Sequence, residues 1–234
     1  PGMAGHDSFV CRLFRHWPRA AYYLMNNKAM ASESPERFGF CGENGGDCRR
    51  AMLSSWSEVQ AAAEQYYDRS SACSFTSFVG YEWTGSPNGR NLHRNIIFGS
   101  SEVPAEPASY VDAPSPRMLW EALERDCLNT GGGCSVVSIP HNSNLSGGLM
   151  FPTDGPDGEA MTADYARRRA GFEPLVETMQ HKGDSACRLG AGEADEYCGF
   201  ETLPYDDFIG NTVPDQKSGV EGRSVEPGGR RAIK

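Results

Sequence analysis

The sequence has no run of about 18 consecutive apolar residues, so it lacks any segment long and apolar enough to cross a membrane as a helix. It also lacks an excess of positive charge. The 22 lysines and arginines are outnumbered by 31 aspartates and glutamates, which gives a formal net charge of −9. Nucleic-acid binders need clustered positive charge, so the composition argues against that class. No Cys-x-x-Cys pair is present, which removes the usual zinc-ribbon and thioredoxin signatures, and we find no internal repeat.

What the chain does contain is enough apolar material for a packed core. Hydrophobic residues make up 38% and aromatic residues 10% of the 234 residues, which argues against global disorder. The sequence begins at Pro1 without a methionine or a signal-peptide pattern, and it ends in GGRRAIK, which is typical of the start of an element. We therefore expect an internal piece of a longer protein, with its signal peptide outside this segment.

Eight cysteines form the most unusual feature of the composition. Three pairs are each joined by a short, polar, glycine-bearing loop that could allow a disulfide: Cys41 with Cys48, Cys127 with Cys134, and Cys187 with Cys198. Cys11 and Cys73 remain as a candidate long-range pair. Disulfides predict an oxidising compartment, either periplasmic or secreted. The alternative is a cytosolic protein with eight reduced thiols.

Strand-like and helix-like segments alternate along the chain, which favours an α/β fold with a largely parallel sheet. The predicted helices cover 19–25, a segment beginning at the Ser55–Glu58 capping box, a segment from Pro116 with Ser115 as its cap, and 162–170. The predicted strands cover 75–83, 92–98, 135–139 and 174–180, and the first two could form a hairpin or be neighbours in one sheet.

Three polar residues lie where these predicted strands begin or end. Glu82 is near the end of one strand, His93 is at the start of the next, and His141 directly follows a third. Residues beyond the carboxyl ends of strands meet at one rim of an α/β barrel. Two imidazoles and a carboxylate suit Zn, Mn or Fe, so we predict a shared metal site. Each residue could instead be structural: Glu82 an exposed strand carboxylate, and each histidine a hydrogen-bonded one.

Several cationic and amide side chains near these residues are candidates for substrate binding. Arg90 and Arg94 flank His93 and could hold an anionic substrate, although two solvated surface guanidiniums explain them equally well. Asn142 could orient a water molecule or His141, or simply form a turn. Lys182 could bind a phosphate, or lie in a surface turn.

Four blocks of the sequence resemble, in order, a known family. FTSFVGYEWT, GRNLHRNIIF, SIPHNSNLSGGLMF and FEPLVETMQHKGDSACRLG are similar to the family called domain of unknown function 3604, from about Phe38 to the C-terminus. That family in turn resembles the polymerase-and-histidinol-phosphatase (PHP) superfamily of metal-dependent phosphoesterases. The resemblance implies a distorted (β/α)7-type barrel around two or three divalent metal ions.

The PHP resemblance also implies ligand roles, residue by residue. Glu82 matches the Gly-x-Glu carboxylate that bridges two metals, His93 the single histidine that follows it, and His141 the histidine of a strand-end block. The amino-terminal His-x-His, the Asp-His and the late Asp-x-His blocks are missing from this sequence. We therefore expect an incomplete barrel with long disulfide-bearing loops. The lead-in would cover 1–37, the barrel elements 38–182 and a truncated loop-rich part 183–234.

The function implied is hydrolysis of a small-molecule ester, most directly a phosphate ester, by a metal-activated water. A metal-dependent amide or sulfate ester hydrolase fits the same ligands. A secreted binding module without catalysis is a further alternative, in which Tyr81, Trp83 and Trp120 would supply a recognition surface. The sequence leaves these alternatives and the oligomeric state open.

Overall fold

The computed structural model describes residues 9–154, 159–185 and 202–212. Its centre is a three-stranded antiparallel sheet in the order β1-β2-β3, with β1 at Gly80–Trp83, β2 at Arg94–Phe98 and β3 at Val136–Pro140. A small second sheet pairs β4 (Met179–Gln180) with β5 (Gly183–Asp184). The predicted hairpin between the first two strands is confirmed, whereas the expected parallel sheet is wrong, since every strand pairing in the described part is antiparallel.

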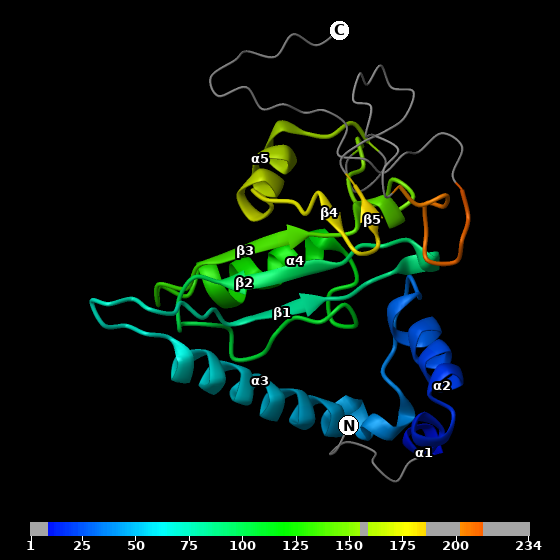
Figure 1. The fold of residues 1–234 in the computed structure, drawn as a ribbon, viewed down its shortest axis with the longest axis horizontal. Coiled ribbons are helices and arrows are strands. Elements are labelled where there is room, and N and C mark those ends of the chain that lie inside the picture. Colours follow the sequence, from blue (N-terminus) through cyan, green and yellow to red (C-terminus); the bar gives the residue numbers. More distant parts are fainter. Residues whose placement is uncertain (1–8, 155–158, 186–201, 213–234) are drawn as a thin grey trace, which may run out of the picture.

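The helices surround this sheet as Figure 1 shows, with α4 behind it and α3 along its β1 side. Their bounds are Phe9–His16 for α1, Pro18–Met25 for α2, Gly46–Tyr66 for α3, Pro116–Leu123 for α4 and Ala163–Phe172 for α5. Single turns lie at Asn26–Met30, Gly39–Cys41, Glu43–Gly45, Pro87–Gly89, Glu124–Leu128 and Ser143–Leu145. No closed barrel is formed by the residues that the structure describes, so the PHP-like barrel remains an expectation.

Helix caps show how local sequence sets these boundaries. The Ser115 hydroxyl accepts a hydrogen bond from the Met118 N–H, and the Thr162 hydroxyl accepts one from the Tyr165 N–H, so both expected helix starts are confirmed. The start expected at Ser55 is wrong, because α3 begins nine residues earlier. The preceding Arg49–Leu53 run has high helix propensity and continues the helix backwards through the capping-box motif.

Two of the expected strands are shorter in the structure than in the sequence pattern. Phe75 and Phe78 are more than half exposed and lie before β1, which keeps only the last four residues of its predicted run. Of the predicted strand 174–180, only Met179 and Gln180 are paired. Aromatic and β-branched residues favour strands, yet a segment becomes a strand only where a partner edge accepts its backbone hydrogen bonds.

The hydrophobic core lies between one face of the sheet and helices α3, α4 and α5. On β2 the inward residues Ile96 and Phe98 are fully buried, and they pack with Trp56 of α3 and Trp120 of α4. Trp83 is also fully buried, and its indole donates to the Ala113 carbonyl at 3.1 Å. Trp83 and Trp120, which were candidates for a recognition surface, are thus core residues, and the third candidate, Tyr81, packs against the core.

A buried cluster of charge joins the sheet to α5. Arg94 Nε lies 2.6 Å from Glu173 Oε1, and Arg169 Nε lies 3.5 Å from Glu173 Oε2. The side chains of Arg94 and Glu173 are only 1% and 3% exposed. Because isolated charges are very costly to bury, the shared carboxylate is what makes this arrangement tolerable.

Two disulfides, Cys41–Cys48 and Cys127–Cys134, are formed as the loop lengths predicted. Cys73 is a free, exposed thiol, so the suggested Cys11–Cys73 pair is wrong. The two cysteines cannot meet because α1, which contains Cys11, and the loop after α3, which contains Cys73, lie far apart in Figure 1. The Cys187–Cys198 pair lies outside the described residues. Two disulfides are consistent with an extracellular or otherwise oxidising compartment.

Within the described residues, no helix has the length and apolar character needed to span a bilayer.

The buried charge cluster generates a stability prediction. Glu173→Gln removes the one carboxylate shared by two guanidiniums, so the free energy of unfolding should fall by about 3 kcal/mol in urea denaturation. Glu64→Gln, which breaks an exposed pair with Arg69, should lower it by less than about 1 kcal/mol. Equal effects of the two substitutions would show that Glu173 does not neutralise buried charge.

The disulfide assignment predicts a specific peptide map. Protein prepared from an oxidising compartment, alkylated without reduction and digested, should yield linked peptides for Cys41–Cys48 and Cys127–Cys134 and an alkylated Cys73. Alkylation of Cys41 or Cys134 in that sample would contradict the structure.

Candidate metal centre

Glu82, His93 and His141 come together at one edge of the central sheet. One ligand atom from each residue lies within 4.8 Å of the others. Glu82 Oε1 is 3.0 Å from His93 Nδ1 and 3.5 Å from His141 Nε2, and the two imidazole rings are 5.6 Å apart and roughly perpendicular. The structure therefore brings together the three residues that the sequence predicted as metal ligands.

The antiparallel register explains why these residues meet. Asn95 of β2 is paired with Glu82 of β1 and with Ile139 of β3. His93 is two residues before Asn95 and His141 is two residues after Ile139, so the two histidines are opposite each other, and the His141 N–H donates to the His93 carbonyl at 3.3 Å. Side chains two residues apart share a face of the sheet, which places both imidazoles beside the Glu82 carboxylate.

The cluster has two buried members and one that is open to solvent. The side chains of His93 and His141 are 12% and 10% exposed, whereas that of Glu82 is 44% exposed. On its closed side, Ser86 Oγ lies 2.8 Å from His93 Nε2, and the Phe208 ring packs 5.7 Å from the His93 ring. A small molecule would therefore reach the cluster from the side of Glu82.

The protonation of the cluster suits metal binding. Hydrogen bonds from His141 and then from His93 hold the pKa of the Glu82 carboxyl well below its usual range, so Glu82 is ionised. Burial lowers the pKa of His93, which favours the neutral imidazole, although Glu82 opposes this shift. An ionised carboxylate and a neutral imidazole are the forms that bind metals.

The donor set also passes a geometric test. Zn, Mn and Fe are held at about 2.0–2.2 Å by carboxylate oxygen and imidazole nitrogen, which places neighbouring ligand atoms about 3–3.5 Å apart. The Glu82 distances to the two histidines fall in this range. His141 Nε2 is the ring nitrogen that faces Glu82, and its Nδ1 is buried without a hydrogen-bond partner, so no contact at Nδ1 fixes which nitrogen carries the proton. The cluster can hold one divalent ion, and within the described residues it is the one His/Cys/Asp/Glu group with this property.

Asn91 holds the backbone segments that carry His93 and His141 next to each other, and the sequence analysis missed it. Its fully buried amide donates to the carbonyls of His141 and Asn142, both at 2.9 Å, while its Oδ1 accepts from the His93 N–H at 2.7 Å. One side chain thus adds to the backbone hydrogen bond from the His141 N–H to the His93 carbonyl in joining these segments beyond the strand ends. The Asn91-x-His93 spacing was visible in the sequence, but the partner segment 50 residues away was not.

Asn142 and Lys182 lie beside the cluster, within a polar network. Asn142 is buried, has a positive φ of 54°, and its Oδ1 accepts from Gln180 Nε2 and from Lys182 Nζ, the latter at 3.4 Å. Its backbone N–H donates to Glu177 Oε2 at 3.2 Å. The charge of Lys182 is close enough to contribute to the lowered pKa of His93. Both residues therefore have the proximity that the sequence analysis expected.

Arg90 and Arg94 do not face the cluster. Arg94 is paired with Trp83 in the sheet register, on the core face, and its guanidinium is buried against Glu173. Arg90 lines a cavity on that same side, together with Arg94. Alternation along the strand explains the outcome, since neighbours in sequence point to opposite faces and His93 faces the cluster.

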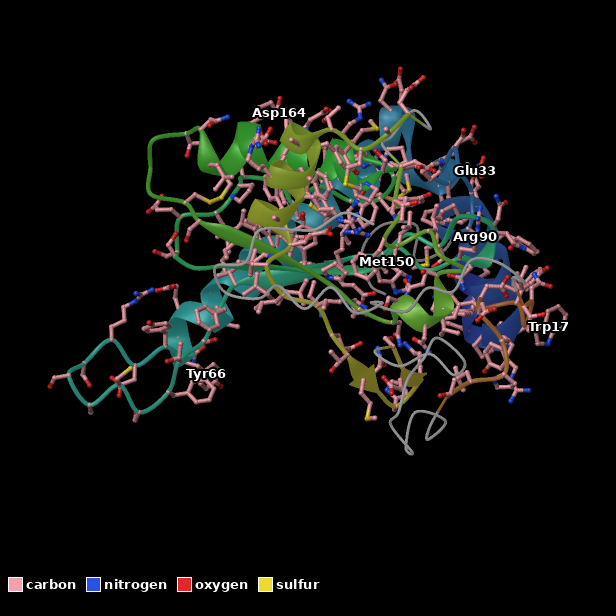
Figure 2. All side chains as sticks on the ribbon, turned by 90° about the horizontal axis from the view of Figure 1, so that it is seen from above. Trp17, Glu33, Tyr66, Arg90, Met150 and Asp164 are labelled. Atoms are coloured by element: carbon pink, nitrogen blue, oxygen red, sulfur yellow. A yellow bond between two sulfur atoms is a disulfide. The ribbon has the colours of Figure 1, made fainter. Side chains whose placement is uncertain are left out.

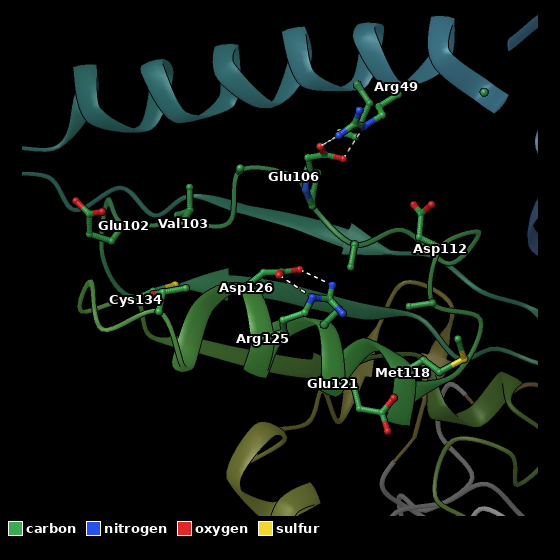
Figure 3. Close-up of a pocket in the computed structure, with 18 of the residues that line it drawn as sticks. Arg49, Glu102, Val103, Glu106, Asp112, Met118, Glu121, Arg125, Asp126 and Cys134 are labelled. Atoms are coloured by element: carbon green, nitrogen blue, oxygen red, sulfur yellow. Dashed lines mark hydrogen bonds and ion pairs between the residues drawn. The ribbon is translucent and has the colours of Figure 1, made fainter. Parts of the chain in front are cut away.

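A cavity of about 880 Å³ lies between α3 and α4, away from the cluster, and is drawn in Figure 3. Its charged side chains are largely paired with one another, as the dashed lines in the figure show for Arg49 with Glu106 and Arg125 with Asp126. None of Glu82, His93 and His141 lines it. With its charges satisfied internally, this cavity does not compete with the cluster as a functional site.

The role of Asn91 is testable. Asn91→Ala leaves two carbonyls and one N–H without partners in a buried setting, so the free energy of unfolding should fall by about 2–3 kcal/mol in urea denaturation. Asn129→Ala, at an exposed position, should change it by less than about 0.5 kcal/mol. An Asn91→Ala protein as stable as the Asn129→Ala control would overturn the assignment.

Comparisons with known proteins place the chain in a family. A search of curated proteins and a search of solved structures each find no match. The family described as "Protein of unknown function (DUF3604)" matches residues 13–224, a span that includes all three cluster residues and Asn91. The chain belongs to the DUF3604 family.

Proposed function

We propose that this chain carries part of the active site of a metal-dependent hydrolase that acts on phosphate esters. The observation that supports this proposal best is the convergence of Glu82, His93 and His141, with two buried imidazoles and a carboxylate open to solvent. A bound Zn, Mn or Fe ion would lower the pKa of a water molecule and polarise the phosphoryl oxygen. Three protein ligands with an open side are typical of catalytic metal sites, whereas structural sites are closed.

The residues of this chain would each have a defined task. Glu82, His93 and His141 would hold the ion, and further ions expected from the PHP resemblance would need ligands beyond these three. Ser86 and Asn91 keep His93 oriented through its ring nitrogen and its backbone N–H. The Phe208 ring packs against the His93 ring, with the ring centroids 5.7 Å apart.

Lys182 is the residue best placed to attract an anionic substrate. Its ammonium lies within 3.4 Å of Asn142 Oδ1, which leaves donors of the ammonium free to bind phosphoryl oxygens. The Asn142 side chain is fixed by Gln180, and Gln180 is held in turn by Glu177 at 2.8 Å. This network would position the cation beside the cluster, and it favours phosphate and sulfate esters over neutral amides.

Metal titration tests the ligand assignment. Calorimetric titration of metal-free protein with Zn²⁺ or Mn²⁺ should give one site whose affinity falls at least about tenfold in Glu82→Gln and in His141→Gln, because each loses a ligand. Glu58→Gln, at an exposed position of α3, should bind like the unmodified protein. Unchanged affinity in both cluster variants would contradict the proposal.

The same variants test the reaction. p-Nitrophenyl phosphate should be hydrolysed in the presence of the bound metal, and the rate should fall at least about a hundredfold with chelator or in Glu82→Gln. p-Nitrophenyl sulfate and p-nitroacetanilide distinguish the sulfate and amide alternatives. Metal binding without hydrolysis of any of the three compounds would favour the binding module.

A further inference from the structure

A second cavity lies on the core face of the central sheet, opposite the face that carries the cluster. It has a volume of about 400 Å³, a size common for small-molecule sites. The start of α4, residues of α5 and the segment around Met150 form its walls. Figure 2 labels Glu33, Arg90 and Met150, which line it and lie on the same side of the molecule. Its four arginines are Arg90, Arg94, Arg117 and Arg169.

Two of these arginines share one counter-charge. Arg94 and Arg169 both pair with Glu173, so this buried trio carries one uncompensated positive charge. Arg169 is only 16% exposed, and burial lowers the pKa of its guanidinium against the attraction of Glu173. An anion in the cavity would supply the missing charge.

The remaining charges leave the cavity positive. Arg90 is partly buried, and its guanidinium makes no hydrogen bond or ion pair with any residue in the described part of the chain. Arg117 is paired with Glu121, and Glu33 accepts a hydrogen bond from Asn88. Three glutamates either line the cavity or pair with its four arginines, namely Glu33, Glu121 and Glu173, which leaves an excess of one positive charge.

The other lining groups define what kind of anion would fit. Trp120 is 1% exposed, and its indole N–H is buried without an acceptor. Leu92, Met150 and Tyr165 add apolar surface to the same wall. The cavity therefore has the free donors of the Arg90 guanidinium together with an apolar lining, and a ligand must bring oxygen acceptors, one negative charge and an apolar body.

We propose that this cavity binds a small organic anion, with a carboxylate, sulfate or phosphate group held by Arg90 and Arg169 and an apolar body against Trp120. The site is separate from the cluster, because the sheet register places Trp83 and Arg94 on one face and Glu82 and Asn95 on the other. It does not depend on the proposed hydrolase activity.

Calorimetric titration of chelator-treated protein with benzoate, phenyl sulfate and phenyl phosphate tests this site, with benzyl alcohol as the neutral match. At least one of the three anions should bind, and benzyl alcohol should bind at least about tenfold more weakly, since it lacks charge-assisted hydrogen bonds. Which anion binds best identifies the head group. Binding of none of the three, or equal binding of benzyl alcohol, would overturn the proposal.

Matched variants locate the site. Arg90→Gln, which breaks no ion pair in the described part, should weaken anion binding about tenfold or more, and Arg169→Gln should do the same if it folds. Arg167→Gln, on the same helix but exposed and outside the cavity, should leave binding unchanged, as should Glu82→Gln. Unchanged binding in Arg90→Gln would overturn the assignment, and loss in Glu82→Gln would move the anion to the cluster.

Discussion

Glu82, Asn95 and Ile139 lie in one row across the three central strands, and this register determines where every functional side chain points. A slip of one residue in either pairing would turn the affected side chains to the opposite face of the sheet. The next row, Trp83, Arg94 and Pro140, belongs to the core face, where Trp83 and Arg94 are almost fully buried. The sheet therefore separates the face that carries the Glu82, His93 and His141 cluster from a core face by alternation alone.

The register must continue beyond the strands, because His93 and His141 are just outside β2 and β3. Asn91 achieves this by binding the backbone of both segments, and the Glu177 carboxylate holds the Asn142 N–H that comes next. Removing a buried polar side chain of this kind lowers the free energy of unfolding, because each backbone group that it leaves without a partner remains buried and unsatisfied. The same contacts that keep the fold intact thus keep the cluster in place.

Local features of the fold were predictable from the sequence, whereas its long-range pairing was not. The Ser115 cap, the helix start at Thr162, the hairpin and the two seven-residue disulfide loops depend on neighbours in sequence, and the structure has all of them. The strand directions and the failure of Cys11 to reach Cys73 depend on tertiary arrangement, which local patterns do not encode. Glu82, His93 and His141 were found because they lie at the ends of predicted strands and form a donor set that suits a metal ion, although they meet through an antiparallel register and not at the rim of parallel strands. Arg94 was misplaced because its pairing with Glu173, 79 residues away, has no local signal.

The central claim is that one divalent ion binds between Glu82, His93 and His141. Anomalous X-ray scattering from crystals of the protein grown with Zn²⁺ or Mn²⁺, recorded on both sides of the metal absorption edge, tests it most directly. The account predicts a difference peak about 2.0–2.2 Å from a Glu82 carboxylate oxygen and from one nitrogen of each histidine. A metal bound elsewhere with these three side chains still hydrogen-bonded to one another would contradict it.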